Sequence, residues 1–278
     1  MLKSFKLINL LIIIIFYTKI CTAEIIIAND ISTIEKQLLE ADENTLILFD
    51  VDQVLITPTD EYNRKISIRK DLYRALEKKY PRQQLKVILS DYYRKRTVKL
   101  VNPKIINLLQ QLKQRKIPFT ALTAWNTGTY GTIEAIENYR FKELNQVSIS
   151  FIDTSPFPDT NFPEVQGTDG VPMIMQGAIL TALVDKAIVL KQALKTSNIN
   201  PKKIIFIDDR IKYVKSVEKM CAKENIDYVG IHYLEDKLIT NKIPDLDEAR
   251  EKLRFQVLEQ EHIWLLDSQL DKRIQSLN

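Results

Sequence analysis

Short apolar runs alternate along the chain with segments whose apolar residues recur at helical spacing. The runs short enough to be buried strands lie at 45–50, 117–123, 147–152, 204–207 and 228–231. The segments with helical spacing lie at 31–41, 102–116, 129–139, 186–194 and 212–223. This alternation predicts an α/β fold, a three-layer α/β/α sandwich around a central parallel sheet.

Residues 61–100 interrupt the alternation. Two amphipathic helices are expected there, one on each side of Pro81. The stretch holds 13 Lys or Arg and 4 Asp or Glu, which gives it a net charge of +9. The charges fit either a solvated helix face or a positively charged cap that attracts an anionic substrate. We therefore treat 61–100 as a basic helical cap insertion in a core formed by 24–60 and 101–241.

Two further segments depart from the strand-helix pattern. Residues 153–172 contain four prolines and little periodicity, which predicts a long loop, and 173–184 suggest a strand or a hairpin. The C-terminal segment 242–278 is highly charged and predicts a long helix. We expect it to pack against its own domain, with a homodimer through this helix as the alternative.

The first 23 residues have the pattern of a secretory signal peptide. Lys3 and Lys6 precede an almost wholly apolar run at 7–17, and small residues follow at 22–23. The run is shorter than the ~20 residues that a membrane span needs. The sequence therefore predicts export to the periplasm or the medium, with no stable membrane span after cleavage. Cys221 would then be the one remaining cysteine, so no internal disulfide is expected.

Composition excludes several kinds of partner and site. Without residues 1–23 the chain has 37 basic and 36 acidic residues, so no nucleic-acid partner is expected. Six glycines and the lack of a G-x-G-x-x-G or Walker A pattern argue against a glycine-rich nucleotide cradle. His232 and His262 are too isolated in sequence to suggest a histidine metal site.

Carboxylates follow two of the predicted strands. Asp50 and Asp52 stand at the end of the first, and Asp208 and Asp209 at the end of the fourth. Open α/β sheets bind ligands at the carboxyl edge of their strands. Carboxylates crowded at such an edge either repel each other, share a proton or hold a cation. The sequence therefore predicts a site at this edge.

The stretch Leu46-Ile47-Leu48-Phe49-Asp50-Val51-Asp52-Gln53-Val54-Leu55 resembles the first motif of the haloacid dehalogenase (HAD) superfamily. Thr123 at a strand end, Lys186 at a helix start and Asp208-Asp209 follow in the order of the other three motifs. The chain also resembles a group of exported bacterial HAD-like proteins. The resemblance implies a HAD-like Rossmannoid core and a magnesium-dependent phosphohydrolase.

The resemblance also implies a role for each motif residue. Asp50 would be the nucleophile and a metal ligand, and Asp52 would be the general acid and base, with its backbone carbonyl on the metal. Asp208 and Asp209 would complete a Mg²⁺ site. Phosphate-binding roles fall on Thr123, whose hydroxyl would donate to a phosphoryl oxygen, and on Lys186, with Lys191 as its rival. The residues expected near the substrate are Trp125 and Asn126, although core packing is an equal alternative for Trp125.

These expectations describe an exported phosphohydrolase that acts on a small phosphomonoester through an aspartyl phosphate. A HAD-fold binding or host-interaction protein without turnover is the alternative, and a phosphotransferase is a third. Gln53, Val54 and Ile56 depart from residues common in HAD phosphatases, so the substrate class stays open.

Overall fold

A central sheet of eight strands organises the fold. The computed structural model describes residues 22–60, 66–168, 170–242 and 247–277. From edge to edge the strands are β1 (Ala23–Ala28), β10 (Asp227–Tyr233), β9 (Lys203–Asp208), β2 (Thr45–Phe49), β5 (Phe119–Thr123), β8 (Ala178–Leu180), β7 (Met173–Met175) and β6 (Thr160–Asn161). The first six pair in parallel, and the last two join as antiparallel strands. The predicted parallel sheet is confirmed, and 173–184 form a hairpin.

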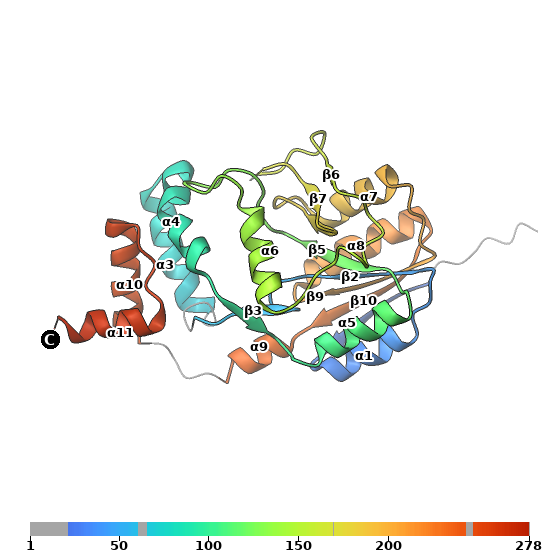
Figure 1. Cartoon of the computed structure of the whole chain (residues 1–278), viewed down its shortest axis with the longest axis horizontal. Helices are drawn as coiled ribbons and strands as arrows, with labels where there is room; N and C mark the ends of the chain where they lie inside the picture. Colours follow the sequence, from blue (N-terminus) through green and yellow to red (C-terminus); the bar gives the residue numbers. More distant parts are fainter. Residues whose placement is uncertain (1–21, 61–65, 169, 243–246, 278) are drawn as a thin grey trace, which may run out of the picture.

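Helices cover both faces of the sheet (Figure 1). The helices α1 (Ile31–Leu39) and α5 (Ile105–Gln114) pack on one face, and α7 (Lys186–Thr196) and α8 (Ile211–Glu224) on the other. Alternate residues of β2 serve the two faces: Ile47 and Phe49 pack with α1 and α5, whereas Leu46 and Leu48 pack with α7 and α8. An apolar run without alternation is therefore what a central strand of a three-layer sandwich requires.

The insertion forms a helical layer beside the sheet. It leaves and rejoins the core through an antiparallel pair, β3 (Ile56–Pro58) and β4 (Val98–Leu100), which the sequence pattern did not predict. Between them lie α3 (Ile66–Lys79) and α4 (Arg82–Lys95), the two expected helices. Residues 61–65, at the start of the predicted insertion, lie outside the described residues.

The C-terminal segment packs on the insertion. It forms α10 (Glu248–Glu261) and α11 (Asp267–Gln275), which gather with α3 and α4 at one end of the molecule (Figure 1). Buried Trp264 lies between them, and its Nε1 donates to Asp60 Oδ2 at 3.0 Å. Its ring centroid is 5.0 Å from that of Tyr92 in α4. The expected packing against the same chain is seen, while a homodimer stays a prediction.

The single long helix expected in this segment is wrong. His262 takes φ 55° and ends α10, so the chain turns before α11 begins. A short helix, α9 (Glu235–Thr240), precedes the segment and was not predicted.

The helix predicted at 129–139 is also wrong. Residues 124–136 form a loop, and the helix α6 spans Glu137–Gln146. Gly128 and Gly131 have φ of +71° and +58°, which turn the chain out of a helical path. The Glu137 carboxylate then accepts from the Gly128 N–H at 2.7 Å. Tertiary contacts of the loop thus set where the helix begins.

The strand predicted at 147–152 does not form. Ser148 has φ 61°, and the following residues run as irregular chain. Ile149 and Phe151 are nevertheless buried in the core. An apolar run at strand length indicates burial here, but not a place in the hydrogen-bonded ladder.

At the N-terminal end, β1, which the sequence pattern did not predict, begins at Ala23. It pairs with β10, the strand predicted at 228–231. Residues 1–21 of the predicted signal peptide lie outside the described residues, so export stays a prediction. None of the helices in the described part of the chain has the length and apolar character needed to cross a membrane.

Candidate active site

The site lies where β2 and β9 end side by side. Phe49 pairs with Ile207, and the Asp50 N–H donates to the Ile207 carbonyl at 2.8 Å. Asp208 is the last residue of β9, so Asp50 and Asp208 leave adjacent parallel strands at one edge. Asp50 is 6% exposed and Asp208 is fully buried. The sheet register alone therefore brings these two carboxylates together.

Lys186 joins the two carboxylates. It is the first residue of α7, is fully buried, and places Nζ 2.8 Å from Asp50 Oδ1 and 2.6 Å from Asp208 Oδ2. The N-cap Asp185 accepts from the Ala187 N–H at 2.9 Å and fixes the start of the helix. Burial disfavours the ammonium charge, but Asp50 and Asp208 hold the pKa of Lys186 above its ordinary value.

The rival lysine lies elsewhere. Lys191 is exposed on α7 and pairs with Glu224 of α8 at 2.5 Å. Lys191 therefore lies on the solvent-exposed side of α7, away from the clustered carboxylates.

Asp50, Asp208 and Asp209 form a group in which one carboxylate oxygen from each lies within 4.8 Å of the others. Burial, together with the neighbouring Asp208 charge, raises the pKa of Asp50 to about 6, although Lys186 opposes the rise. Burial and the charges of Asp50 and Asp208 raise the pKa of Asp209 to about 8. The Lys186 ammonium and the Arg210 guanidinium, whose Nε lies 4.0 Å from Asp209 Oδ1, do not balance three carboxylates, so this oxygen set could hold a metal ion.

Thr123 stands at the same edge. It is the last residue of β5, the other neighbour of β2, and is 1% exposed. Its carbonyl accepts from the Thr181 N–H at 2.9 Å, which ties the strand end to the loop after β8. The four predicted elements, from β2, β5, α7 and β9, thus converge on one edge of the sheet.

Asp52, the expected general acid and base, is bound in an ion cluster. Its two carboxylate oxygens bind the guanidinium groups of Arg96 and Arg140, one oxygen to each. Burial works against the charge, but Arg140 and Arg96 hold the pKa of Asp52 below its ordinary value. Asp52 is not among the three clustered carboxylates, which Asp209 completes instead.

Arg96 and Arg140 share a second acid, Glu143. Arg96 Nη1 lies 3.2 Å from Glu143 Oε1, and Arg140 Nη1 lies 2.9 Å from Glu143 Oε2. Both guanidinium side chains and Glu143 are buried. We call Asp52, Arg96, Arg140 and Glu143 the buried ion cluster. Arg96 is one of the basic residues of the insertion, but it lies neither on a solvated helix face nor on a surface that could attract a substrate. Its side chain instead connects the insertion to the core.

Trp125, two residues after Thr123, is held by the same cluster. The Arg140 guanidinium lies 3.8 Å from the ring centroid, and the indole Nε1 donates to the Ile136 carbonyl at 3.0 Å. Trp125 is 6% exposed, so it packs in the core and also lines a cavity beside the site. Trp125 therefore packs in the core, as one alternative expected, and also lines a cavity, as the other would require.

A cavity of 240 Å³ lies between the core and the insertion, and two of its lining residues, Ala124 and Arg210, directly follow Thr123 and Asp209 in the sequence. Its lining residues are Asp52, Gln53, Pro58, Tyr92, Tyr93, Arg96, Ala124, Trp125, Asn126, Leu183 and Arg210. Trp125 and Asn126 were expected near a substrate. Tyr92, Tyr93, Leu183 and Arg210 were missed, although Arg210 directly follows Asp209 in the sequence.

Several known proteins are similar to this chain. An "Uncharacterized protein" of Rickettsia prowazekii (strain Madrid E) is 24% identical over 230 residues, covering 79% of this chain and 82% of that protein. A "Putative outer membrane protein" of Chlamydia muridarum (strain MoPn / Nigg) is 30% identical over 139 residues, covering 49% of this chain and 50% of that protein.

A solved structure is also similar, the crystal structure of a HAD family hydrolase from Salmonella enterica subsp. enterica serovar Typhi. It is 16% identical, covers 75% of this chain and 74% of its own, and has a TM-score of 0.34. A TM-score this low transfers neither a fold in detail nor a function.

The protein-family comparison covers most of the chain. The model described as "Protein of unknown function (DUF2608)" matches residues 28–271, which include every clustered carboxylate and the whole insertion. The chain belongs to this family.

Proposed function

We propose that the protein is a magnesium-dependent phosphohydrolase that acts on phosphomonoesters through a phosphorylated Asp50. One observation carries the proposal: Lys186 bridges Asp50 and Asp208 at the carboxyl edge of the sheet, with Asp209 beside them. A phosphoryl group needs a nucleophile, a cation and donors for its oxygens, and these residues supply each one. The order of the motif residues along the chain, which resembles that of the HAD superfamily, supports the same reaction.

Asp50 is the group that attacks phosphorus. Its Oδ1 accepts from the Val51 N–H at 2.7 Å and contacts Lys186 at 2.8 Å. Within the described residues both contacts use Oδ1, which leaves Oδ2 to form the bond to phosphorus while the bond to the leaving oxygen breaks. The leaving oxygen takes a proton as its bond breaks. Water then attacks the phosphorus of the aspartyl phosphate, gives up a proton, and releases phosphate and the free carboxylate, and Asp52 is the group assigned to both proton transfers. The Lys186 ammonium and the Thr123 hydroxyl compensate charge on the phosphoryl oxygens.

Asp50, Asp208 and Asp209 would hold the metal ion. When bound, Mg²⁺ neutralises charge on the phosphoryl oxygens and lowers the repulsion between the anionic nucleophile and its target. The raised pKa values of Asp50 and Asp209 are consistent with a group of carboxylates that a cation would stabilise in the ionised form.

Replacing Asp209 with asparagine is expected to weaken Mg²⁺ binding roughly tenfold or more, because one carboxylate of a small ligand set is lost. Asp209 is the cleaner target than Asp208, since Lys186 keeps both of its carboxylate partners. Calorimetric titration of Mg²⁺ into the variant and the wild type measures the change. Asp153→Asn, which changes an exposed acid paired with Lys113, is the control. Equal Mg²⁺ affinity in Asp209→Asn and wild type would contradict the ligand assignment.

The function itself is tested with a panel of phosphomonoesters, assayed for released phosphate with and without Mg²⁺. Phosphate release that requires Mg²⁺ is the expected result. A second measurement, the mass of the protein quenched during the reaction, detects a phosphoryl group on Asp50. Absence of both released phosphate and protein-bound phosphate across the panel would contradict the proposal.

The pairing of Asp52 favours a second candidate, a protein that takes up a phosphoryl group but releases it slowly or passes it to an alcohol. Both Asp52 oxygens are bound to guanidinium groups, so proton transfer at the leaving oxygen requires this carboxylate to leave Arg96 or Arg140. Phosphorylated Asp50 that accumulates in the quenched reaction, with little free phosphate, would support this candidate over rapid hydrolysis.

We also propose that the protein acts after export. The basic start and apolar run of residues 1–23 support this, as does the name of the Chlamydia relative. Cleavage after Ala23 would leave Glu24–Ala28 of β1 in the sheet. The protein recovered from the periplasm or medium should therefore begin at Glu24, and Ile13→Arg, which interrupts the apolar run, should retain residues 1–23. Uncleaved wild-type protein in the cytosol would contradict export.

A further inference from the structure

Trp264 joins the C-terminal segment to the insertion. It lies between α10 and α11 and is 1% exposed. Its backbone N–H donates to Asp91 Oδ2 at 2.8 Å, and its carbonyl accepts from Lys95 Nζ at 3.3 Å. Asp91 and Lys95 lie one turn apart on α4, and their charged groups are 3.0 Å from each other. One helix of the insertion therefore binds both polar backbone groups of Trp264.

The indole of Trp264 makes further contacts. Its Nε1 donates at 3.0 Å to Asp60 Oδ2, just after β3, where the chain leaves the core for the insertion. The ring centroid lies 6.0 Å from that of Phe255 in α10 and 5.0 Å from that of Tyr92 in α4. Asp60 and Tyr92, which flank most of the insertion in sequence, thus meet at one side chain of the C-terminal segment.

A series of ring contacts runs from Trp264 to the cavity between the core and the insertion. Tyr92 meets Trp264 at an interplanar angle of 77° and lies 5.1 Å from Tyr93. Tyr93 in turn lies 5.4 Å from Trp125 and 4.9 Å from Tyr130, again between ring centroids. Tyr92, Tyr93 and Trp125 all line the cavity. Trp264 therefore supports, from outside the cavity, the wall that α4 contributes to it.

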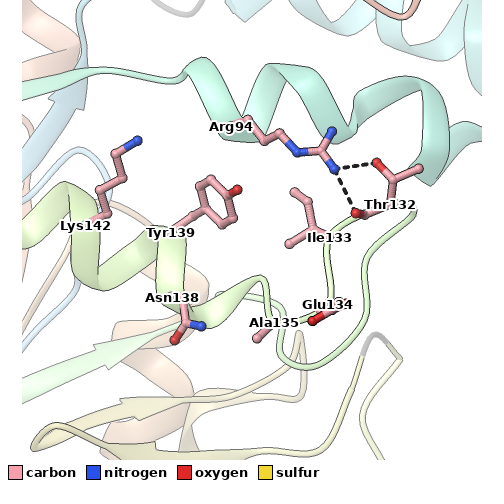
Figure 2. A pocket seen from close by; sticks show the side chains of 8 residues that line it. All are labelled: Arg94, Thr132, Ile133, Glu134, Ala135, Asn138, Tyr139 and Lys142. Atoms are coloured by element: carbon pink, nitrogen blue, oxygen red, sulfur yellow. Dashed lines mark hydrogen bonds between the residues drawn. The ribbon is translucent and has the colours of Figure 1, made fainter.

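Another face of α4 is bonded to the loop before α6. Figure 2 shows Arg94 beside Thr132 at a hollow of 440 Å³, where Arg94 Nη2 donates to the Thr132 carbonyl at 2.7 Å and to its hydroxyl at 2.6 Å. One turn earlier, the Ser90 hydroxyl accepts from the Thr132 N–H at 3.0 Å. The helix is thus held from the core side by this loop and from the outer side by Trp264.

A wall that is fixed before a ligand enters favours binding. A tyrosine ring that is free to change rotamer in the empty protein must be ordered when the ligand arrives, and this ordering costs affinity. The edge-to-face contacts with Trp264 and Tyr93 restrict the Tyr92 ring in advance. Removing the Trp264 ring should therefore weaken binding of any ligand large enough to reach Tyr92.

We propose that Trp264 is a positioning residue that holds Tyr92 and Tyr93 in the wall of the substrate cavity. The inference rests on the proposed phosphohydrolase function, because it places the phosphoryl group at Asp50 and the rest of the ester in this cavity. Asp52, which lines the cavity, stands two positions after Asp50. The insertion and the C-terminal segment then act together as the surface that binds the leaving group.

Calorimetric titration of non-hydrolysable phosphonates in Mg²⁺ tests this role. Methylphosphonate reports the phosphoryl site alone, whereas benzylphosphonate and (2,3-dihydroxypropyl)phosphonate add a larger apolar or polar group. The one of these two that binds wild-type protein more tightly is the reference ligand. In Trp264→Leu its affinity should fall about tenfold, because two loosened rings must be ordered on binding, while methylphosphonate affinity should stay within about twofold of wild type.

Two further variants separate the ring from other effects. Trp264→Phe keeps a ring against Tyr92 but loses the hydrogen bond to Asp60, so it should melt earlier yet bind the reference ligand within about threefold of wild type. Tyr80→Phe is the matched control, since it removes a different bond between the insertion and the C-terminal segment, from Tyr80 to Glu259 at 2.7 Å, away from the residues that line the cavity. It should keep the wild-type affinities.

Turnover provides an independent measurement. With the phosphate ester that corresponds to the reference ligand, Trp264→Leu should raise KM about tenfold and leave kcat within about twofold, because Asp50 and Lys186 are unchanged. If Trp264→Leu does not fold, Asp91→Ala, which removes the acceptor of the Trp264 N–H, replaces it with an expected loss of about threefold in affinity for the reference ligand.

The outcomes separate the inference from the function on which it rests. Equal losses for methylphosphonate and the reference ligand in Trp264→Leu, or equal losses in Trp264→Leu and Trp264→Phe, would show a general effect on the fold and overturn the positioning role. If neither larger phosphonate binds wild-type protein more tightly than methylphosphonate, the cavity does not hold the leaving group; the inference is then wrong and the phosphoryl site stands. If no phosphonate binds, the phosphoryl site itself fails, and the inference falls with it.

Discussion

The Asp50→Asn variant is expected to lose phosphomonoester turnover by at least about 10⁴-fold, because an amide cannot form the aspartyl phosphate. The fold should survive the change. Asp50 is buried beside two other carboxylates, so the amide removes a repulsion and leaves Lys186 paired with Asp208. Steady-state phosphate release and a thermal melt of the same preparation measure both parts of this expectation.

A matched control variant distinguishes the loss of the Asp50 carboxylate from the general effect of changing a charge. Lys191→Gln removes a charge from α7, the helix that bears Lys186, but on its solvent face, and should keep wild-type turnover. Wild-type rates in pure Asp50→Asn would show that this carboxylate does not form the intermediate. Loss of both activity and the melting transition would show that the variant tests folding rather than chemistry.

The central site could be predicted because its residues follow from strand ends. Asp50, Thr123 and Asp208 close apolar runs, and parallel strands bring such ends to one edge regardless of what lies between them. Lys186 begins a helix after Asp185, a residue typical of an N-cap, so its place was also visible in the sequence.

The surroundings of the site could not be read in the same way. Arg96 belongs to a basic stretch and resembles its neighbours Arg94 and Lys95 in sequence. Arg96 is nevertheless buried, whereas Arg94 and Lys95 are partly exposed. Its partners, Asp52 and Glu143, are 44 and 47 residues away along the chain. Amphipathic spacing shows which face of a helix is apolar, but not which charge an ion pair will bury.

Arg140 illustrates a second limit. The helix expected at 129–139 ended just before it, whereas the observed α6 begins at Glu137 and turns Arg140 into the core. The boundary depends on Gly131, where an added Cβ would lie 2.3 Å from the Lys86 carbonyl oxygen in the insertion. Contact between loop and insertion, invisible to local pattern, thus decides which side chain meets Asp52.

The buried ion cluster leads to the second large effect. Replacing Arg140 with methionine should lower the free energy of unfolding by about 3–5 kcal/mol, because Asp52 and Glu143 then share one guanidinium instead of two. For a chain of this size that corresponds to a fall in Tm of roughly 6–20 °C. Urea denaturation followed by circular dichroism measures the loss. Lys191→Met, which breaks an exposed pair with Glu224, should change stability by no more than about 0.5 kcal/mol.

A double-mutant cycle tests whether the cluster acts as a unit. Glu143→Met alone leaves Arg140 bound to Asp52, whereas Arg140→Met and Glu143→Met together remove one buried charge of each sign. The double variant should be more stable than the sum of the single losses by about 0.5–3 kcal/mol, because the second change removes a charge that the first left poorly paired. Additive losses would mean that each side chain contributes through packing alone. Coupling would mean that Arg140 and Glu143 act together as a buried ion pair beside Asp52.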